Sequence, residues 1–273
     1  MIIPFVLRLN NFMSKSEKEL AFLQDLYIAT DWTKRFTDLI GEDFKADEFE
    51  NILYINAGTG NHALALEEKL DEDTEMTAVA QTQELLHIAQ AKAEALKSNV
   101  KFTAEIPDEK FDAVIADASF VKPSNLKEFM RRAANASRWQ IAFLLPTAGS
   151  FGEIFSYLWQ TLLELDWLEK GTEIENLLNE IPTVSEAEDM TKDLGFKTVE
   201  AKTKNEVFEF ENGEEFVASP LVKDFLFENW LGFLNEDEKE RVLEKLANTI
   251  DAGCDGLTFR FAVKATLITG AKG

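Results

Sequence analysis

The sequence predicts an α/β fold in which a parallel, doubly wound sheet is flanked by helices. Short apolar runs alternate with helix-forming stretches between Ile52 and Leu145. The connections between these runs are short, which is typical of repeated β–α units. A Gly-Thr-Gly loop joins the first apolar run to the helix-forming stretch that follows it.

Helices are expected before the first strand. Ser14 or Ser16 is placed to cap a helix that carries Leu20, Leu23, Leu26 and Tyr27 at helical spacing. A second helix is expected over residues 31–40, so residues 1–45 form an N-terminal helical extension. Residues 1–12 lack the features of a signal peptide, and Met13 begins a more natural start. We therefore expect residues 1–12 to be an upstream extension that adds little to the fold.

The sheet is expected to continue by regular alternation. Strands are predicted over residues 52–55, 76–80, 100–103, 111–116 and 140–145. Helices are predicted between them, over residues 62–70, 82–96 and 124–136. Pro146 ends the fifth strand, because proline cannot donate to a strand ladder.

The second half of the chain has a different pattern. Helices are predicted over residues 151–168 and 171–181, then a helix with a Ser185–Glu188 capping box that ends at Gly195. Two strands are predicted over 197–202 and 206–210, a helix capped by Asn235, and a last strand over 257–268. With no linker or repeat, we expect one domain over residues 1–273 with a helical cap inserted at 151–182.

Composition excludes several classes of function. The chain carries 28 Lys and Arg against 50 Asp and Glu, a net charge of −22, which disfavours nucleic acid and anionic membrane surfaces as partners. One cysteine, Cys254, and two histidines, His62 and His87, leave no disulfide and no histidine- or cysteine-rich metal site. No apolar run is long enough for a spanning helix, so cytoplasm is the expected location. The 22 phenylalanines are expected mainly in the core.

The Gly58–Gly60 loop is the main indication of a ligand. Glycine allows a tight turn and lets backbone N–H groups approach a ligand at the carboxyl end of a strand. The alternative is a tight turn with no ligand. Gly58-x-Gly60-x-x-Ala63 also fits a loose dinucleotide pattern, but that reading needs an acid or an arginine about 20 residues on. The second strand ends in Val79-Ala80-Gln81, which disfavours a nicotinamide enzyme.

Several segments resemble the class I S-adenosylmethionine-dependent methyltransferases, especially bacterial enzymes that act on small molecules. Residues 52–61, 77–79, 84–89, 111–116, 195–199 and 265–272 look like successive motifs of that family. The resemblance implies a seven-stranded, Rossmann-like sheet of order 3-2-1-4-5-7-6 with the last strand antiparallel. It also implies a site for S-adenosylmethionine formed by Tyr54, Asn56, Gly58, Thr59, Gly60, Ala80, Gln81 and Glu105, with Glu105 placed near the adenine.

The same resemblance defines two competing functions. The family has acids where this chain has Tyr54 and Ala80, and a glycine where it has Asn56. The first function is methyl transfer to a small, partly apolar molecule held under the cap, with a substrate pocket formed by Phe151, Phe155, Tyr157 and Trp159. His62 and Asp117 are candidate bases, although a helix start and a turn cap also explain them. The second function is a degenerate binding or scaffold protein. The sequence carries no signal for an oligomeric state.

Overall fold

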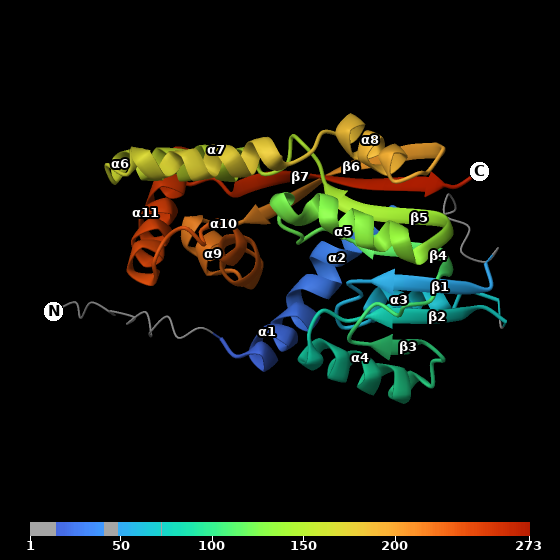
Figure 1. Cartoon of the computed structure of the whole chain (residues 1–273). Coiled ribbons are helices and arrows are strands. Elements are labelled where there is room, and N and C mark those ends of the chain that lie inside the picture. The colour runs from blue at the N-terminus through green and yellow to red at the C-terminus, as the bar shows by residue number, and fades with distance from the viewer. Residues whose placement is uncertain (1–14, 41–48, 72) are drawn as a thin grey trace.

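The computed structural model describes residues 15–40, 49–71 and 73–273. Its centre is a seven-stranded sheet of order β3-β2-β1-β4-β5-β7-β6 (Figure 1). The parallel strands are β1 (Asn51–Ile55), β2 (Glu75–Val79), β3 (Lys101–Thr103), β4 (Phe111–Asp117) and β5 (Ser137–Pro146). Strand β7 (Phe259–Ala271) runs antiparallel between β5 and β6 (Thr198–Phe210). The predicted strand order and antiparallel last strand are confirmed.

Both faces of the sheet are covered, because strand residues alternate between two hydrophobic cores. In β1, Ile52 and Tyr54 belong to one core, whereas Leu53 and Ile55 belong to the other. Helices α5 (Pro123–Ala136) and α8 (Val184–Asp193) pack into the second core. Helices α3 (Asn61–Glu67) and α4 (Gln83–Leu96) pack into the first, together with the N-terminal helices. This is the doubly wound arrangement that the alternation predicts.

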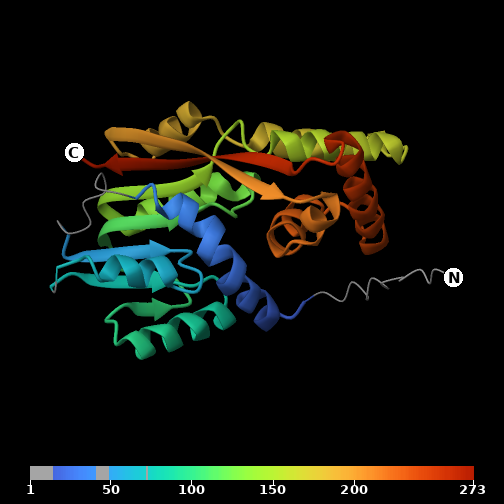
Figure 2. The same ribbon diagram turned by 180° about the vertical axis from the view of Figure 1, so that it is seen from behind.

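The N-terminal helices form one continuous segment, which we call the N-terminal helix. It consists of α1 (Glu17–Leu23), the π-helix η1 (Gln24–Trp32) and α2 (Thr33–Thr37). Ser16 caps it in a reciprocal capping box with Glu19. Figure 2 shows the segment running diagonally past the carboxyl ends of the parallel strands. The expectation for residues 1–12 lies outside the described residues.

A second lobe extends from the sheet beyond the carboxyl ends of the parallel strands (Figures 1 and 2). Strands β6 and β7 pair along 13 residues each. The lobe packs against the second half of β6 and the first half of β7. The helices of the lobe are α6 (Gly152–Glu164), η3 (Leu168–Lys170), α7 (Gly171–Glu180), α9 (Gly213–Ala218), η4 (Leu221–Leu226), α10 (Phe227–Trp230) and α11 (Glu236–Cys254). Buried phenylalanines fill its centre, among them Phe155, Phe216, Phe259 and Phe261.

Two sequence predictions for the second half were wrong in detail. The capping box of α8 is formed by Thr183 and Glu186, not by Ser185 and Glu188. The two strands predicted over 197–202 and 206–210 are one strand, because β7 continues to pair with β6 through the polar residues between them. Within the described residues, no helix has the length and apolar character needed to cross a membrane.

Candidate functional site

The glycine loop leaves β1 at the carboxyl edge of the sheet in a strained conformation. Asn56, Gly58 and Gly60 all have positive φ, at 61°, 59° and 83°. The Gly58 N–H donates to Oε1 of Gln81, 3.1 Å away, so a side chain at the end of β2 accepts the hydrogen bond that a ligand would otherwise receive. A Cβ on Gly60 would stand 2.6 Å from Cζ of Phe102, so packing already requires glycine at this position.

Asp117 lies at the carboxyl end of β4, beside this loop. Its backbone oxygen accepts from Nδ2 of Asn56 at 2.8 Å, and its Oδ1 accepts from the Ser119 N–H at 2.8 Å. Burial raises the pKa of the Asp117 carboxyl to about 6. The hydroxyl of Ser119 is buried and has no hydrogen-bond partner among the described residues. Two polar groups are therefore held at this edge with hydrogen-bonding capacity left over.

His62, in the first turn of α3, faces Tyr54 rather than open solvent. Its Nδ1 lies 3.1 Å from the Tyr54 hydroxyl, and the two rings meet edge to face. Burial lowers the pKa of His62 to about 4, so the ring is neutral at pH 7. Burial likewise raises the pKa of Tyr54 well above its usual value, with the Asp117 charge adding to the effect. The two residues form a neutral pair in which Tyr54 is buried and His62 is half-buried.

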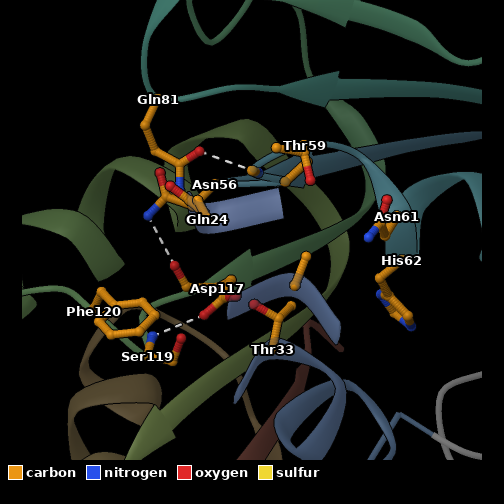
Figure 3. A pocket seen from close by; sticks show the side chains of 13 residues that line it. Gln24, Thr33, Asn56, Thr59, Asn61, His62, Gln81, Asp117, Ser119 and Phe120 are labelled. Atoms are coloured by element: carbon orange, nitrogen blue, oxygen red, sulfur yellow. Dashed lines mark hydrogen bonds between the residues drawn. The ribbon is translucent and has the colours of Figure 1, made fainter. Parts of the chain in front are cut away.

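The N-terminal helix covers the site at the carboxyl edge of the sheet. Nε2 of Gln24 lies 3.0 Å from the point where a Cβ on Gly58 would stand. Ala29 and Thr33 face the same space, opposite Asp117, Ser119 and Phe120. The cavity that remains has a volume of about 30 Å³ (Figure 3). That volume holds one or two water molecules.

The structure brings together only part of the predicted site. Asn56, Gly58, Thr59, His62, Gln81 and Asp117 line the cavity. Ala80 does not; it is fully buried, and its N–H donates to the Thr103 oxygen at 3.0 Å. Three further predicted residues also lie outside the cavity lining. Gly60 packs against Phe102, Tyr54 contacts His62, and Glu105 is exposed. Of the eight predicted cofactor contacts, Asn56, Gly58, Thr59 and Gln81 line the cavity.

The four residues predicted to form a substrate pocket lie in or at the edge of the second lobe. Phe151 and Phe155 are buried against Trp230, with ring centroids 4.8 and 4.9 Å from it. The Tyr157 hydroxyl lies near Sγ of Cys254, and Trp159 is 37% exposed. None of the four lines the cavity at the glycine loop.

Sequence reasoning missed the side chains that close the site. Gln24, Ala29 and Thr33 come from the N-terminal helix, whose apolar spacing indicated only a packing face. Ser119 and Phe120 follow β4 directly, and their nearness to the predicted Asp117 was the available signal. Trp32, one turn from Ile28, stacks among Phe120, Phe151 and Phe208 with centroid distances of 4.9, 6.1 and 5.4 Å. The N-terminal helix thus lies in the space between the glycine loop and the second lobe.

Comparison with solved structures identifies this architecture. The YcgJ protein of Bacillus subtilis matches with a TM-score of 0.54 and 16% identity, over 87% of this chain and 98% of its own. A candidate methyltransferase of Bacillus halodurans C-125 matches with the same four values. A candidate sarcosine dimethylglycine methyltransferase of Galdieria sulphuraria gives a TM-score of 0.51 at 13% identity, over 90% and 88%.

The chain has the class I methyltransferase fold. At these identities the likeness concerns the fold alone. No protein-family model matches the sequence, and neither does any curated protein sequence.

S-adenosylmethionine does not fit the site of this methyltransferase-fold chain. Pockets for ligands of that size have volumes of roughly 300–1,000 Å³, whereas the cavity at the glycine loop measures about 30 Å³. Ala80, at the end of β2, is fully buried and offers only a methyl group. Gln24 and Gln81 occupy both sides of Gly58. The chain's own side chains occupy the space around Gly58.

Proposed function

We propose that this chain is a degenerate methyltransferase-fold protein that binds or scaffolds a partner and does not hold S-adenosylmethionine. The observation that carries the proposal is the filled cleft over Gly58, where the cavity measures about 30 Å³. The replacement of acids by Tyr54 and Ala80 supports it further. A nucleoside cofactor would find no space over Gly58 and no acid at the end of β2.

The free energy gained by burying part of the N-terminal helix supports the same proposal. Ile28, Trp32 and Phe36 are all at most 1% exposed. Burying three such side chains contributes about 5–9 kcal/mol at the usual 1.5–3 kcal/mol each. A ligand that had to displace all three would lose about four to six powers of ten in affinity. This part of the helix is a permanent element of the core, not a lid.

Calorimetric titration with S-adenosylmethionine and S-adenosylhomocysteine tests the proposal. We expect no binding at 1 mM ligand, so any binding free energy would be weaker than about −4 kcal/mol. Mass spectrometry of gently purified protein provides an independent readout. Stoichiometric copurified cofactor, or a micromolar dissociation constant, would refute the proposal.

The variant Ala80→Asp sharpens this test. If Ala80 faced a ribose, a new acid would tighten a nucleoside-bearing ligand by about 1.5–3 kcal/mol. Because Ala80 is fully buried, we instead expect a loss of several kcal/mol of stability from an unpaired buried carboxylate, and no gain in affinity. Gln83→Glu is the matched control, since it adds the same charge at a nearby exposed position that does not line the cavity. Tighter binding by folded Ala80→Asp contradicts the proposal.

A second candidate function is a methyltransferase that acts on a small, partly apolar molecule. The specific observation in its favour is Asp117, a buried carboxyl with a pKa of about 6 that faces the cavity beside the unpartnered Ser119 hydroxyl. A carboxyl group with such a pKa suits general-base catalysis near neutral pH. Release of S-adenosylhomocysteine in the presence of small-molecule extracts, abolished in Asp117→Asn, would establish this candidate in place of the first.

A further inference from the structure

The N-terminal helix has two parts that differ in how firmly they are held. We call residues 17–27 the arm and residues 28–37 the anchor. The anchor buries Ile28, Trp32 and Phe36, whereas Ala21 is the one buried residue of the arm. The π-helix Gln24–Trp32 spans the junction between the two parts. Wide helical turns of this kind are rare and are frequent at functional sites.

The arm is fastened to the glycine loop through one carboxylate. Oδ1 of Asp25 accepts from Oγ1 of Thr59 at 2.6 Å and also from Nζ of Lys92. The same Nζ donates to Oδ1 of Asn61 at 2.5 Å, which fixes the direction of the lysine. Thr59 is 1% exposed, whereas the side chains of Asp25 and Lys92 are about a quarter exposed. The buried hydroxyl is therefore fixed, and the carboxylate lies where solvent reaches it.

The Thr59 hydroxyl and the Lys92 ammonium together form a binding site for a carboxylate oxygen. A hydroxyl from the glycine loop and an ammonium from α4 converge on one oxygen. If Asp25 left, the buried Thr59 hydroxyl would lose its acceptor and Lys92 its counter-ion. A carboxylate from elsewhere restores both contacts, and charge-assisted hydrogen bonds of this type are among the stronger ones.

We propose that Thr59 and Lys92 form a carboxylate-binding subsite that the chain fills with its own Asp25, and that an external carboxylate competes for it by releasing the arm. The inference rests on the proposed function, because it names a ligand class for a cleft that the cofactor does not fill. Release of the arm moves Gln24 away from Gly58 while the anchor stays in the core.

The energetic balance favours release of the arm alone. A partly exposed ion pair contributes little to stability, and alanine buries little apolar surface. A second contact, between Lys15 and Asp224, ties the chain just before the arm to η4 and is also partly exposed. Because Asp25 is tethered, its effective concentration at the subsite is in the millimolar range or above. A simple carboxylate competes poorly with it, so the subsite is best tested in a variant that lacks the tethered group.

Chemical rescue of Asp25→Ala by sodium formate provides that test. We expect the variant to unfold at lower temperature and its arm to be cleaved faster in limited proteolysis. Formate should reverse the loss of thermal stability with saturation; for a dissociation constant on the order of 10 mM, 100 mM formate raises the folded-to-unfolded ratio by about tenfold. Because formate is not bonded to the arm, cleavage of the arm should stay fast. Acetate should act similarly if the vacated space admits its methyl group.

The controls separate recognition of a carboxylate from general effects of salt and of helix sequence. Formamide has the shape of formate without its charge, and sodium chloride has its ionic strength; neither should rescue. Asp31→Ala lies in the same π-helix and breaks a surface ion pair with Arg35, so formate should not affect it specifically. In Asp25→Ala/Lys92→Met the formate effect should disappear. An equal effect of chloride, its persistence in the double variant, or no rescue of folded Asp25→Ala would overturn the subsite.

This experiment fails independently of the proposed function. Tight binding of S-adenosylmethionine to the unaltered chain refutes the proposed function, whatever formate does to Asp25→Ala. Absence of both cofactor binding and formate rescue leaves the proposed function standing and removes the subsite.

Discussion

Replacing Gly60 with alanine tests whether packing, and not a ligand, requires glycine in this loop. Gly60 has φ of 83°, and an added Cβ would stand 2.6 Å and 2.9 Å from two atoms of the Phe102 ring. The left-handed conformation costs about 1–2 kcal/mol for a residue with a Cβ, and overpacking costs about 1–3 kcal/mol. We expect Gly60→Ala to lower the free energy of unfolding by roughly 2–5 kcal/mol, a large part of the total for a domain.

Urea unfolding of two alanine variants isolates the packing contribution. Gly149 also has positive φ, 99°, but no atom lies within 4 Å of an added Cβ. Gly149→Ala therefore incurs the backbone cost alone, and we expect Gly60→Ala to lose about 1–3 kcal/mol more. The double variant Gly60→Ala/Phe102→Leu should show a favourable coupling energy, because leucine lacks the ring edge that collides. Equal losses in the two single variants, with no coupling to Phe102, would refute this reasoning.

The remaining predictions concern two titrating groups and the aromatic anchor. Burial raises the pKa of Asp117 from 3.8 to about 6, so the native state gains stability from this group as pH falls from 6 to 4. Burial lowers the pKa of His62 from 6.5 to about 4, so the native state loses stability over nearly the same range. Each pKa shift amounts to about 3 kcal/mol of stability. When urea unfolding is measured at pH 7.5 and then at pH 4.5, Asp117→Asn should lose stability relative to the unaltered chain, and His62→Gln should gain it. Parallel curves of stability against pH would count against both assignments. Trp32→Ala should cost about 3–5 kcal/mol in the same assay, because the indole is fully buried among aromatic rings, and a loss below 1 kcal/mol would mean that the helix is not anchored there.

The sheet was predictable from sequence because its signals are local. Each β–α unit of the first half is marked in the sequence by an apolar run, a short connection and a residue that favours a helix start. Thr82 is an example, since its side chain caps α4. Strand β6 was divided in two because Thr203, Lys204 and Asn205 are polar. Their strand conformation depends on pairing with residues 264–266 of β7, about 60 residues further along the chain.

Local patterns can also be ambiguous when they occur twice. Thr183–Glu186 and Ser185–Glu188 both have the spacing of a capping box, and they overlap by two residues. The structure uses the earlier pair, whose Thr183 Oγ1 accepts from the Glu186 N–H at 3.2 Å. Nothing in either tetrapeptide alone decides between them.

The candidate site was predictable only where its residues follow the strands. Gly58, Gln81 and Asp117 lie at the carboxyl ends of β1, β2 and β4, where the fold class places a ligand. Gln24 and Thr33 reach the same point from a helix that precedes the sheet in sequence. Their contribution depends on the angle at which that helix crosses the sheet, which hydrophobic periodicity does not specify.

The packing of Trp32 against β6 has a consequence for folding during synthesis. Its ring lies against Phe208, and nearby Arg35 donates to the backbone oxygen of Val207, 172 residues later in the chain. At 5–20 residues per second, a ribosome needs roughly 10–35 s to produce that partner strand. Strand β6 then waits for β7, which lies between it and β5. Burial of the N-terminal helix is thus completed only after β6 has been made, and a nascent chain stalled before β6 leaves the Phe208 side of Trp32 uncovered.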